Sequence, residues 1–457
     1  MTTLSAAAAW TGHDTRLILA TVLAIAVIVL LISNLKLHPL LALTIGSGVL
    51  GIVAGMPVDK LLKSFESGVG STVASVGLLI AFGAMLGKLL ADSGGADRIV
   101  DTILGRVHGK GLPWAMALVA ALIGLPMFFE IGLVMLIPVV LLVAKRSGKP
   151  VLLLGIPALA GLSVLHGLIP PHPGPLAAAG ALNANVGITL ALGLLVGIPT
   201  VIVAGPLFGR VAARLVPDAA PPARLVPESE STDVDRRPSF AATLSTVLLP
   251  VVLMLAKALA DILLGKENAV RRVLDFVGDP LVALLVAVLV GMVVLGRPAR
   301  FDRAQLTKIV GDALAPIAGI VLIVAAGGGF KQTLVDAGVG DVITSLSTGA
   351  HLSPLLLGWL VAVAIRLATG SATVATVSAA GIVAPLAATL DPTHNALLVL
   401  AIGAGSLFFS HLNDAGFWLV KEYFGMSVGQ TLKTWSVMET VVSVVAIALI
   451  LPLGALL

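Results

Sequence analysis

The chain has no cysteine among its 457 residues, and only 11% of its residues are charged and 4% aromatic. Without cysteine it can form no disulfide, thiolate nucleophile or iron–sulfur cluster, and its compartment cannot be read from redox chemistry. In a soluble globular protein about a quarter of the residues are charged. The low charge therefore excludes that class and indicates a protein that uses lipid as its solvent.

The sequence motifs of several catalytic classes are also missing. No GxxxxGK[ST] pattern is present, which argues against an ATP-driven machine, and neither HExxH nor GxSxG occurs. We therefore expect no cofactor, no bound metal and no enzymatic activity. The formal charge of +4 is small for this length, so the sequence does not indicate nucleic-acid binding.

Long apolar runs recur along the chain. A transmembrane helix needs roughly 20 apolar residues, and runs of about this length cover Leu17–Ser33, Pro39–Gly55, Val151–Ile169, Leu190–Phe208, Leu281–Leu295 and Thr440–Leu457. No series of alternating ten-residue strands is visible, so a barrel is not expected. The 49 glycines and 26 prolines fit closely packed or broken helices inside a bundle. The sequence predicts an all-α polytopic membrane protein.

A polar, proline-rich segment at 217–238 separates two halves, 1–216 and 239–457, that resemble each other. The stretch LLADSGGADRIV from Leu89 is similar to TLVDAGVGDVIT from Thr333, and three aligned pairs share a spacing of 244 residues: Asp92 with Asp336, Gly94 with Gly338, and Asp97 with Asp341. An internal duplication explains this similarity. We expect two repeats joined by a cytoplasmic linker.

Each half contains two interruptions of its apolar pattern. The first interruption is GLPMFFEIG in the first half and ATGSATVAT in the second, and we interpret both as re-entrant hairpins. The second is HGLIPPHPG in the first half and SHLNDAG in the second, and we interpret both as broken helices. The substrate site of a transporter with such repeats lies near the membrane midplane.

Orientation follows from the positive-inside rule. The rule places most lysines and arginines in five cytoplasmic segments: Arg98–Lys110, Lys145–Lys149, Arg210–Arg237, Arg297–Lys308 and Lys421–Lys433. The resulting topology has about ten crossings, two hairpins, oppositely oriented repeats and both termini outside the cell. Arg271 and Arg272 fall on the wrong side in this topology.

Glu130 lies in PMFFEIGLVML, an apolar stretch at the proposed tip of the first hairpin. An ionisable group in hydrocarbon requires a partner, a cavity or a function. Burial raises the pKa of a carboxyl group toward values at which the group can bind and release a transported proton. We expect Glu130 to take part in proton coupling, together with Asp414 in the second broken helix; a structural partner role is the alternative.

The stretch HGLIPPHPGP holds His166 and His172 among four prolines. Consecutive prolines cannot continue a helix, because they lack amide donors and clash with the preceding turn. The unwound segment would expose carbonyls and amides to a ligand. Each histidine is a candidate proton carrier or substrate donor, and a neutral ring bonded to a nearby carbonyl is the alternative for each.

The second half supplies hydroxyl, amide and charged groups at its two interruptions. A hydroxyl-rich anion needs many donors and acceptors at close range, and the candidate substrate-binding residues are Gly370, Ser371, Thr373, Thr376, Ser410, His411 and Asn413. Arg366 precedes Gly370 by one turn, and its planar guanidinium can hold a carboxylate through two hydrogen bonds. Its alternative role is a salt bridge to Glu130 or Asp414.

These interrupted stretches resemble the gluconate permease family of proton symporters, within a wider superfamily of ion transporters. The similarity runs from about Leu17 to Leu453 and is carried by LPMFFEIGLVMLIPV, LHGLIPPHPGP, RLATGSATVA and FFSHLNDAGFWLVKEYFGM. It implies uptake of gluconate or a related sugar acid with protons across the bacterial inner membrane. The wider superfamily implies a homodimer and an elevator-like movement of a transport domain.

Three other functions stay open at this point. Within transport, the alternative is a sodium-coupled symporter of another small hydroxy- or amino-carboxylate. Outside transport, an intramembrane enzyme based on Glu130 and the histidines, or a sensor that binds without accumulating its ligand, is the alternative.

Overall fold

The computed structural model describes residues 11–125, 129–221, 237–265, 267–339, 342, 353–412 and 414–457. Within these ranges the chain is helical and contains no strand, which confirms the predicted all-α class. Most of the predicted linker, residues 222–236, and the candidate Asn413 lie outside the described residues.

The first half of the chain is a series of helices, several of which lie on the predicted apolar runs. They are α1 (Gly12–Ser33), α2 (Pro39–Ala54), α3 (Val58–Thr72), α4 (Leu78–Asp92), α5 (Gly95–Leu104), α6 (Leu112–Gly124), α7 (Phe129–Ser147), α8 (Val151–Leu168), α9 (Pro173–Leu182), α10 (Val186–Ile202) and α11 (Phe208–Leu215). Pro39 opens α2 and Pro173 opens α9. Proline suits the first turn of a helix because the amide it lacks would have no partner there.

The second half contains a corresponding series. Its helices are α12 (Phe240–Leu263), α13 (Ala269–Val277), α14 (Pro280–Val294), α15 (Arg303–Asp312), α16 (Ala318–Asp336), α18 (Pro354–Thr369), α19 (Ala372–Ala387), α20 (Pro392–Ser406), α21 (Ala415–Tyr423), α22 (Val428–Thr431) and α23 (Val437–Leu456). A π-helical turn, Leu432–Ser436, joins α22 to α23.

Six helical segments among the described residues are long and apolar enough to cross a membrane, and two bent helix pairs raise this number to at most eight. Four shorter apolar helices include α18 and α19, the arms of the second predicted hairpin. Length and composition thus indicate a multi-pass membrane protein, while the figure of about ten crossings stays a prediction.

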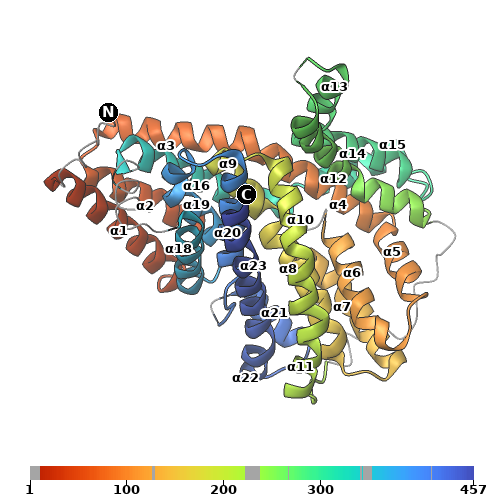
Figure 1. Cartoon of the computed structure of the whole chain (residues 1–457). Coiled ribbons are helices and arrows are strands. Elements are labelled where there is room, and N and C mark those ends of the chain that lie inside the picture. The colour runs from red at the N-terminus through yellow and green to blue at the C-terminus, as the bar shows by residue number, and fades with distance from the viewer. Residues whose placement is uncertain are drawn as a thin grey trace.

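The halves are interleaved rather than side by side. Figure 1 shows α1 and α2 at one end of the molecule and α12, α14 and α15 at the other, with α8, α10, α20 and α23 between them. At the first end α3 packs on α16 of the other half, and at the second end α15 packs on α4. Ser64 Oγ on α3 donates to Asp336 Oδ2 on α16 over 2.5 Å.

Two glycines aligned by the internal repeat share an unusual backbone conformation. Gly94 has φ of +71° and Gly338 has φ of +83°, and each lies two residues after the aspartate that ends its helix. Side chains other than hydrogen make this left-handed conformation costly. The aligned glycines therefore form the same left-handed turn at the end of a helix in each half, which agrees with a duplication.

Arg271, which conflicts with the predicted topology, has local partners. Its guanidinium lies 2.7 Å from Asp261 Oδ1 and 3.8 Å from Asp275 Oδ2, and it donates to the carbonyl of Leu264 over 2.6 Å. These contacts join α12 to α13, the short helix before α14. A basic residue neutralised in this way carries little orientation signal, so its position in the predicted topology weighs little against that topology.

Candidate functional site

A cavity of about 270 Å³ lies where the interrupted segments of the two halves meet. Its wall includes Phe129 at the start of α7, Ser163 and His166 on α8, and residues of α18, α19, the turn before α21, and α23. Leu407 on the same wall follows α20. Both halves of the chain therefore contribute to one site, as the repeat interpretation predicts.

The turn between α18 and α19 presents polar groups to this cavity. Gly370 has φ of +72° and ends α18 in a left-handed conformation that favours glycine. Ser371 then begins α19: its Oγ accepts a hydrogen bond from the amide of Val374 over 3.3 Å. The first amides of a helix have no partner within it and favour negative charge. With Thr373 on the same wall, the turn supplies hydroxyl and amide donors.

Arg366 lies in the last turn of α18 with only 4% of its side chain exposed. Its Nη2 pairs with Oδ2 of Asp414, the residue of the second broken segment that caps α21. Its Nε is buried and has no hydrogen-bond partner among the described residues. A buried guanidinium with a donor left over can still bind an acceptor supplied by a ligand.

Asp414 is held by several donors at once. Besides Arg366 it receives a hydrogen bond from Ser410 Oγ, and its Oδ1 accepts from the amide of Gly416 over 2.8 Å, which caps α21. The indole Nε1 of Trp435 donates to Ser410 Oγ over 2.7 Å. Asp414 is thus anchored as the counter-ion of Arg366, the alternative that the sequence left open for this arginine.

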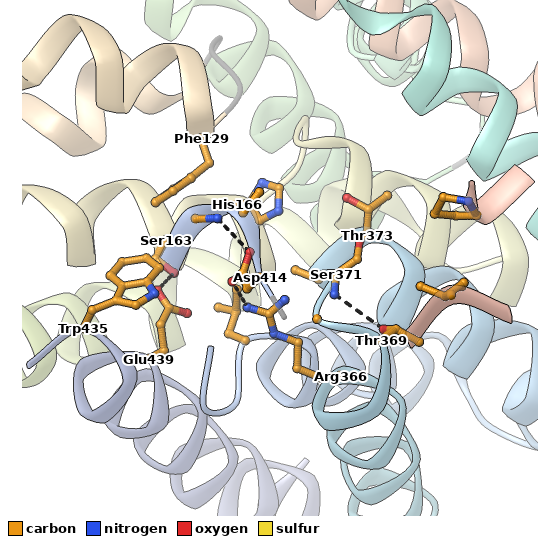
Figure 2. Close-up of a pocket in the computed structure, with 17 residues that line it drawn as sticks. Phe129, Ser163, His166, Arg366, Thr369, Ser371, Thr373, Asp414, Trp435 and Glu439 are labelled. Carbon is orange, nitrogen blue, oxygen red and sulfur yellow. Dashed lines mark hydrogen bonds and ion pairs between the residues drawn. The ribbon is translucent and has the colours of Figure 1, made fainter. Parts of the chain in front are cut away.

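Glu439 and Ser163 form a second polar contact in the cavity wall. Ser163 Oγ on α8 donates to Glu439 Oε1 on α23 over 2.5 Å, and both residues are buried. Figure 2 shows Ser163, Trp435 and Glu439 together on one side of the cavity and Thr369, Ser371 and Thr373 on the other, with Arg366 and Asp414 between them. Neither Glu439 nor Ser163 is among the residues predicted from the sequence.

The structure brings six of the predicted site residues to this cavity: His166, Arg366, Gly370, Ser371, Thr373 and Asp414. Four others lie away from its wall. His172 is buried and donates from Nε2 to the carbonyl of Gly124 over 2.6 Å, and His411 Nε2 donates to the carbonyl of Leu367 over 3.2 Å. Thr376 is buried beside Gly174. Ser410 is buried and donates a hydrogen bond to Asp414.

Glu130, the remaining predicted acid, lies in the first turn of α7, next to Phe129. The Phe129 ring borders the cavity and stacks near Trp435, with 5.6 Å between the ring centroids. The end of the first hairpin therefore reaches the site. The side chain of Glu130 itself lies outside the described part of the structure.

The sequence signal for Glu439 was present but ambiguous. The last apolar run of the sequence begins at Thr440, so the glutamate lies directly before this run and not within it. In the structure α23 already begins at Val437, and the acid lies inside it. An acidic residue within one turn of an apolar run is the pattern that would have identified it.

Comparison with known proteins gives one consistent result. The family model described as "GntP family permease" matches residues 16–457 of this chain. A gluconate permease of Pseudomonas aeruginosa is 50% identical, covering 98% of this chain and 99% of its own length. The Gnt-II system L-idonate transporter of Escherichia coli is 44% identical, covering 95% and 98%.

Among solved structures, the YdaH transporter of Alcanivorax borkumensis, described as having an unusual topology, aligns with a TM-score of 0.64. The alignment covers 94% of this chain and 97% of that one, at 19% identity. At this identity the likeness concerns the fold alone. All the relatives compared are named as permeases or transporters.

Proposed function

Since the chain belongs to the GntP family of permeases and is therefore a transporter rather than an enzyme, we propose that it takes up gluconate or a related sugar acid by proton symport. The membrane would be the bacterial inner membrane. Relatives at 50% and 44% identity are named for gluconate and L-idonate, both hydroxylated monocarboxylates, which supports this class of substrate.

The observation that carries the proposal is the composition of the cavity wall. One guanidinium, that of Arg366, lies beside the hydroxyls of Ser371 and Thr373 and the amides that begin α19. A monoanion entering a site of low dielectric must exchange its hydration for charged and polar donors. The volume of about 270 Å³ is just below the roughly 300–1,000 Å³ of pockets for drug-sized ligands, and suits an acid of about a dozen non-hydrogen atoms.

We assign the substrate carboxylate to Arg366 and the turn Gly370–Thr373. The broken segments, with Ser410, His411 and Asn413 in one half and His166 and His172 in the other, serve the substrate hydroxyls and the proton, some of them through a neighbour rather than by contact. Thr376 supports the first break, because it lies beside Gly174. The acids of the interrupted segments, Glu130 and Asp414, take part in coupling: Asp414 does so by positioning Arg366.

Transport also requires alternating access, for which we propose two inverted repeats, 1–216 and 239–457. The interleaved packing of α3 on α16 and of α15 on α4 supports this arrangement. The linker at 217–238 would lie in the cytoplasm and both termini outside. The end of this linker is fixed to the first half, since Arg237 pairs with Asp101 over 2.8 Å. An elevator-like movement on a homodimeric scaffold completes the proposal.

Uptake by purified protein in liposomes tests the function. We expect labelled gluconate to accumulate when an inward pH gradient is imposed and to equilibrate when a protonophore removes it. A sodium gradient alone should have no effect. Accumulation that needs sodium and ignores pH would instead favour the alternative, a sodium-coupled carboxylate symporter, and a panel of labelled acids defines the substrate.

A further inference from the structure

We infer that Glu439 is the group that binds and releases the transported proton, with Ser163 as its hydrogen-bond partner in both protonation states. The inference rests on the proposed proton symport and names the residue that performs it. It starts from the position of Glu439, which borders the cavity from the first turn of α23 and is only 1% exposed.

The contact with Ser163 suits a carboxyl group that changes its protonation. A hydroxyl has one donor and two acceptor sites, so it can donate to a carboxylate and accept from a carboxylic acid in the same place. The distance of 2.5 Å between Ser163 Oγ and Glu439 Oε1 fits either direction. An arginine or lysine in place of Ser163 would hold the group in one state only.

Among the described residues, no lysine or arginine lies within ion-pair distance of Glu439. The nearby guanidinium of Arg366 is engaged with Asp414, so the pair offers little net charge to a third group. A charged carboxylate with only a hydroxyl for compensation is costly at membrane depth, and uptake of a proton removes that cost.

Asp414 is less suited to carry the proton. Arg366, Ser410 and the amide of Gly416 all donate to its oxygens, so these donors already occupy the positions that a proton would need. The other titratable groups around the site are His166 on α8, which borders the cavity, and His172, whose ring lies 5.8 Å from that of His166. Glu130 lies at the start of α7.

Asp414 and Glu439 thus have different roles in coupling. Asp414 orients Arg366 for the substrate carboxylate, whereas Glu439 senses the charge of the cavity. An anion entering beside an ionised Glu439 meets like-charge repulsion, and an anion entering beside the neutral acid does not. Substrate binding and proton binding therefore favour each other by the same free energy, as linkage requires.

The transport step balances in atoms and charge. At the outer side a hydronium ion transfers its proton to a carboxylate oxygen of Glu439 and leaves as water, and a monoanion binds at Arg366. At the inner side the new O–H bond breaks, a water molecule accepts the proton to form hydronium, and the anion leaves. One proton per monoanionic substrate makes the movement electroneutral.

Glu439→Gln tests the inference, because glutamine keeps the size and hydrogen bonding of the side chain but cannot titrate. In liposomes we expect this variant to exchange labelled gluconate for unlabelled gluconate while losing accumulation driven by a pH gradient. Substrate affinity should also lose its pH dependence. Glu422→Gln, the same change at an exposed acid of α21, should behave as wild type.

Glu439→Asp supplies a second measurement, since it keeps a titratable group and should retain some proton-driven accumulation. Proton-driven accumulation by Glu439→Gln would overturn the inference, as would a folded Glu439→Gln variant that neither binds nor exchanges gluconate. Failure of the proposed function itself gives a different result, because wild-type protein would then not respond to a pH gradient.

Discussion

Arg366 and Asp414 form a buried ion pair between the last turn of α18 and the cap of α21, two segments that are interrupted in the middle of the apolar bundle. Removing one partner of such a buried pair lowers the free energy of unfolding of the protein by about 3–5 kcal/mol, because the other charge stays buried without compensation. The pair therefore links the geometry of the proposed anion site to the stability of the bundle, and the two effects can be separated by mutation.

Arg366→Lys keeps the charge but loses the planar guanidinium. If the guanidinium binds the substrate carboxylate, KM for gluconate should rise about tenfold or more, equal to about 1.4 kcal/mol. A purely structural counter-ion would leave KM nearly unchanged. Uptake kinetics in liposomes measure the difference.

The double variant Arg366→Met with Asp414→Leu provides the control for that experiment. Removing both charges should restore folding relative to either single variant, because no uncompensated charge stays buried. We expect the folded double variant to bind no gluconate. Full transport would exclude Arg366 from the site and leave the amides near Ser371 and Thr373 as the anion-binding group.

Glu130→Gln should abolish concentrative uptake without reducing the amount of protein in the membrane. Asp414→Asn should lower both exchange and accumulation, because Arg366 loses its counter-ion. Counterflow and gradient-driven uptake, measured on the same proteoliposomes, separate these two results. Ordinary accumulation by both variants would show that neither acid contributes to coupling.

The ends of the two hairpins should meet in the middle of the protein. Because the native chain has no cysteine, Leu125→Cys with Ala372→Cys introduces only the intended pair. We expect a short bifunctional reagent to join them, which a shift on a gel detects. Leu125→Cys with Asp14→Cys is the matched negative pair, since Asp14 lies about 27 Å along α1 from Ile32, which borders the cavity.

A close crossing of α8 and α20 should make glycine indispensable at position 403. A Cβ atom added to Gly403 would lie 2.0 Å from the carbonyl oxygen of Gly167, a backbone atom that cannot turn away. Gly403→Ala should lower the melting temperature in detergent by several degrees, from a cost of about 1–3 kcal/mol or more. Gly48→Ala, with no atom within 4 Å of the new methyl group, should be neutral. Equal melting temperatures would contradict the crossing.

The helical fold could be read from the sequence because its determinants are local. Apolar runs predicted the bounds of α1, α2, α8, α10, α14 and α23 to within about six residues, and proline or glycine marked the interruptions. The last apolar run shows the limit of that approach, because it begins at Thr440 and leaves out Glu439, which lies inside α23. A glutamate beside an apolar run looks like the end of a helix until packing against another helix shows that it is buried.

The site was predicted as a set of segments rather than as a set of contacts. Clustering of polar residues at the interruptions identified Arg366, Ser371 and Asp414, all of which border the cavity. Whether a polar residue beside a break faces the cavity depends on the rotation of its helix, which one sequence does not specify. His172 and His411 lie in the non-helical breaks themselves, where they bond to backbone carbonyls instead of bordering the cavity.

The contact between Ser163 and Glu439 also has a consequence for biosynthesis. The two residues are separated by 276 positions, and a ribosome adding about 5–20 residues per second needs about 14–55 s to cover that interval. Ser163 and the first broken segment are therefore inserted long before the helix that completes their wall exists. Assembly of the cavity waits for the last helix of the chain, so a truncated product that reaches the bilayer carries half of a site and transports nothing.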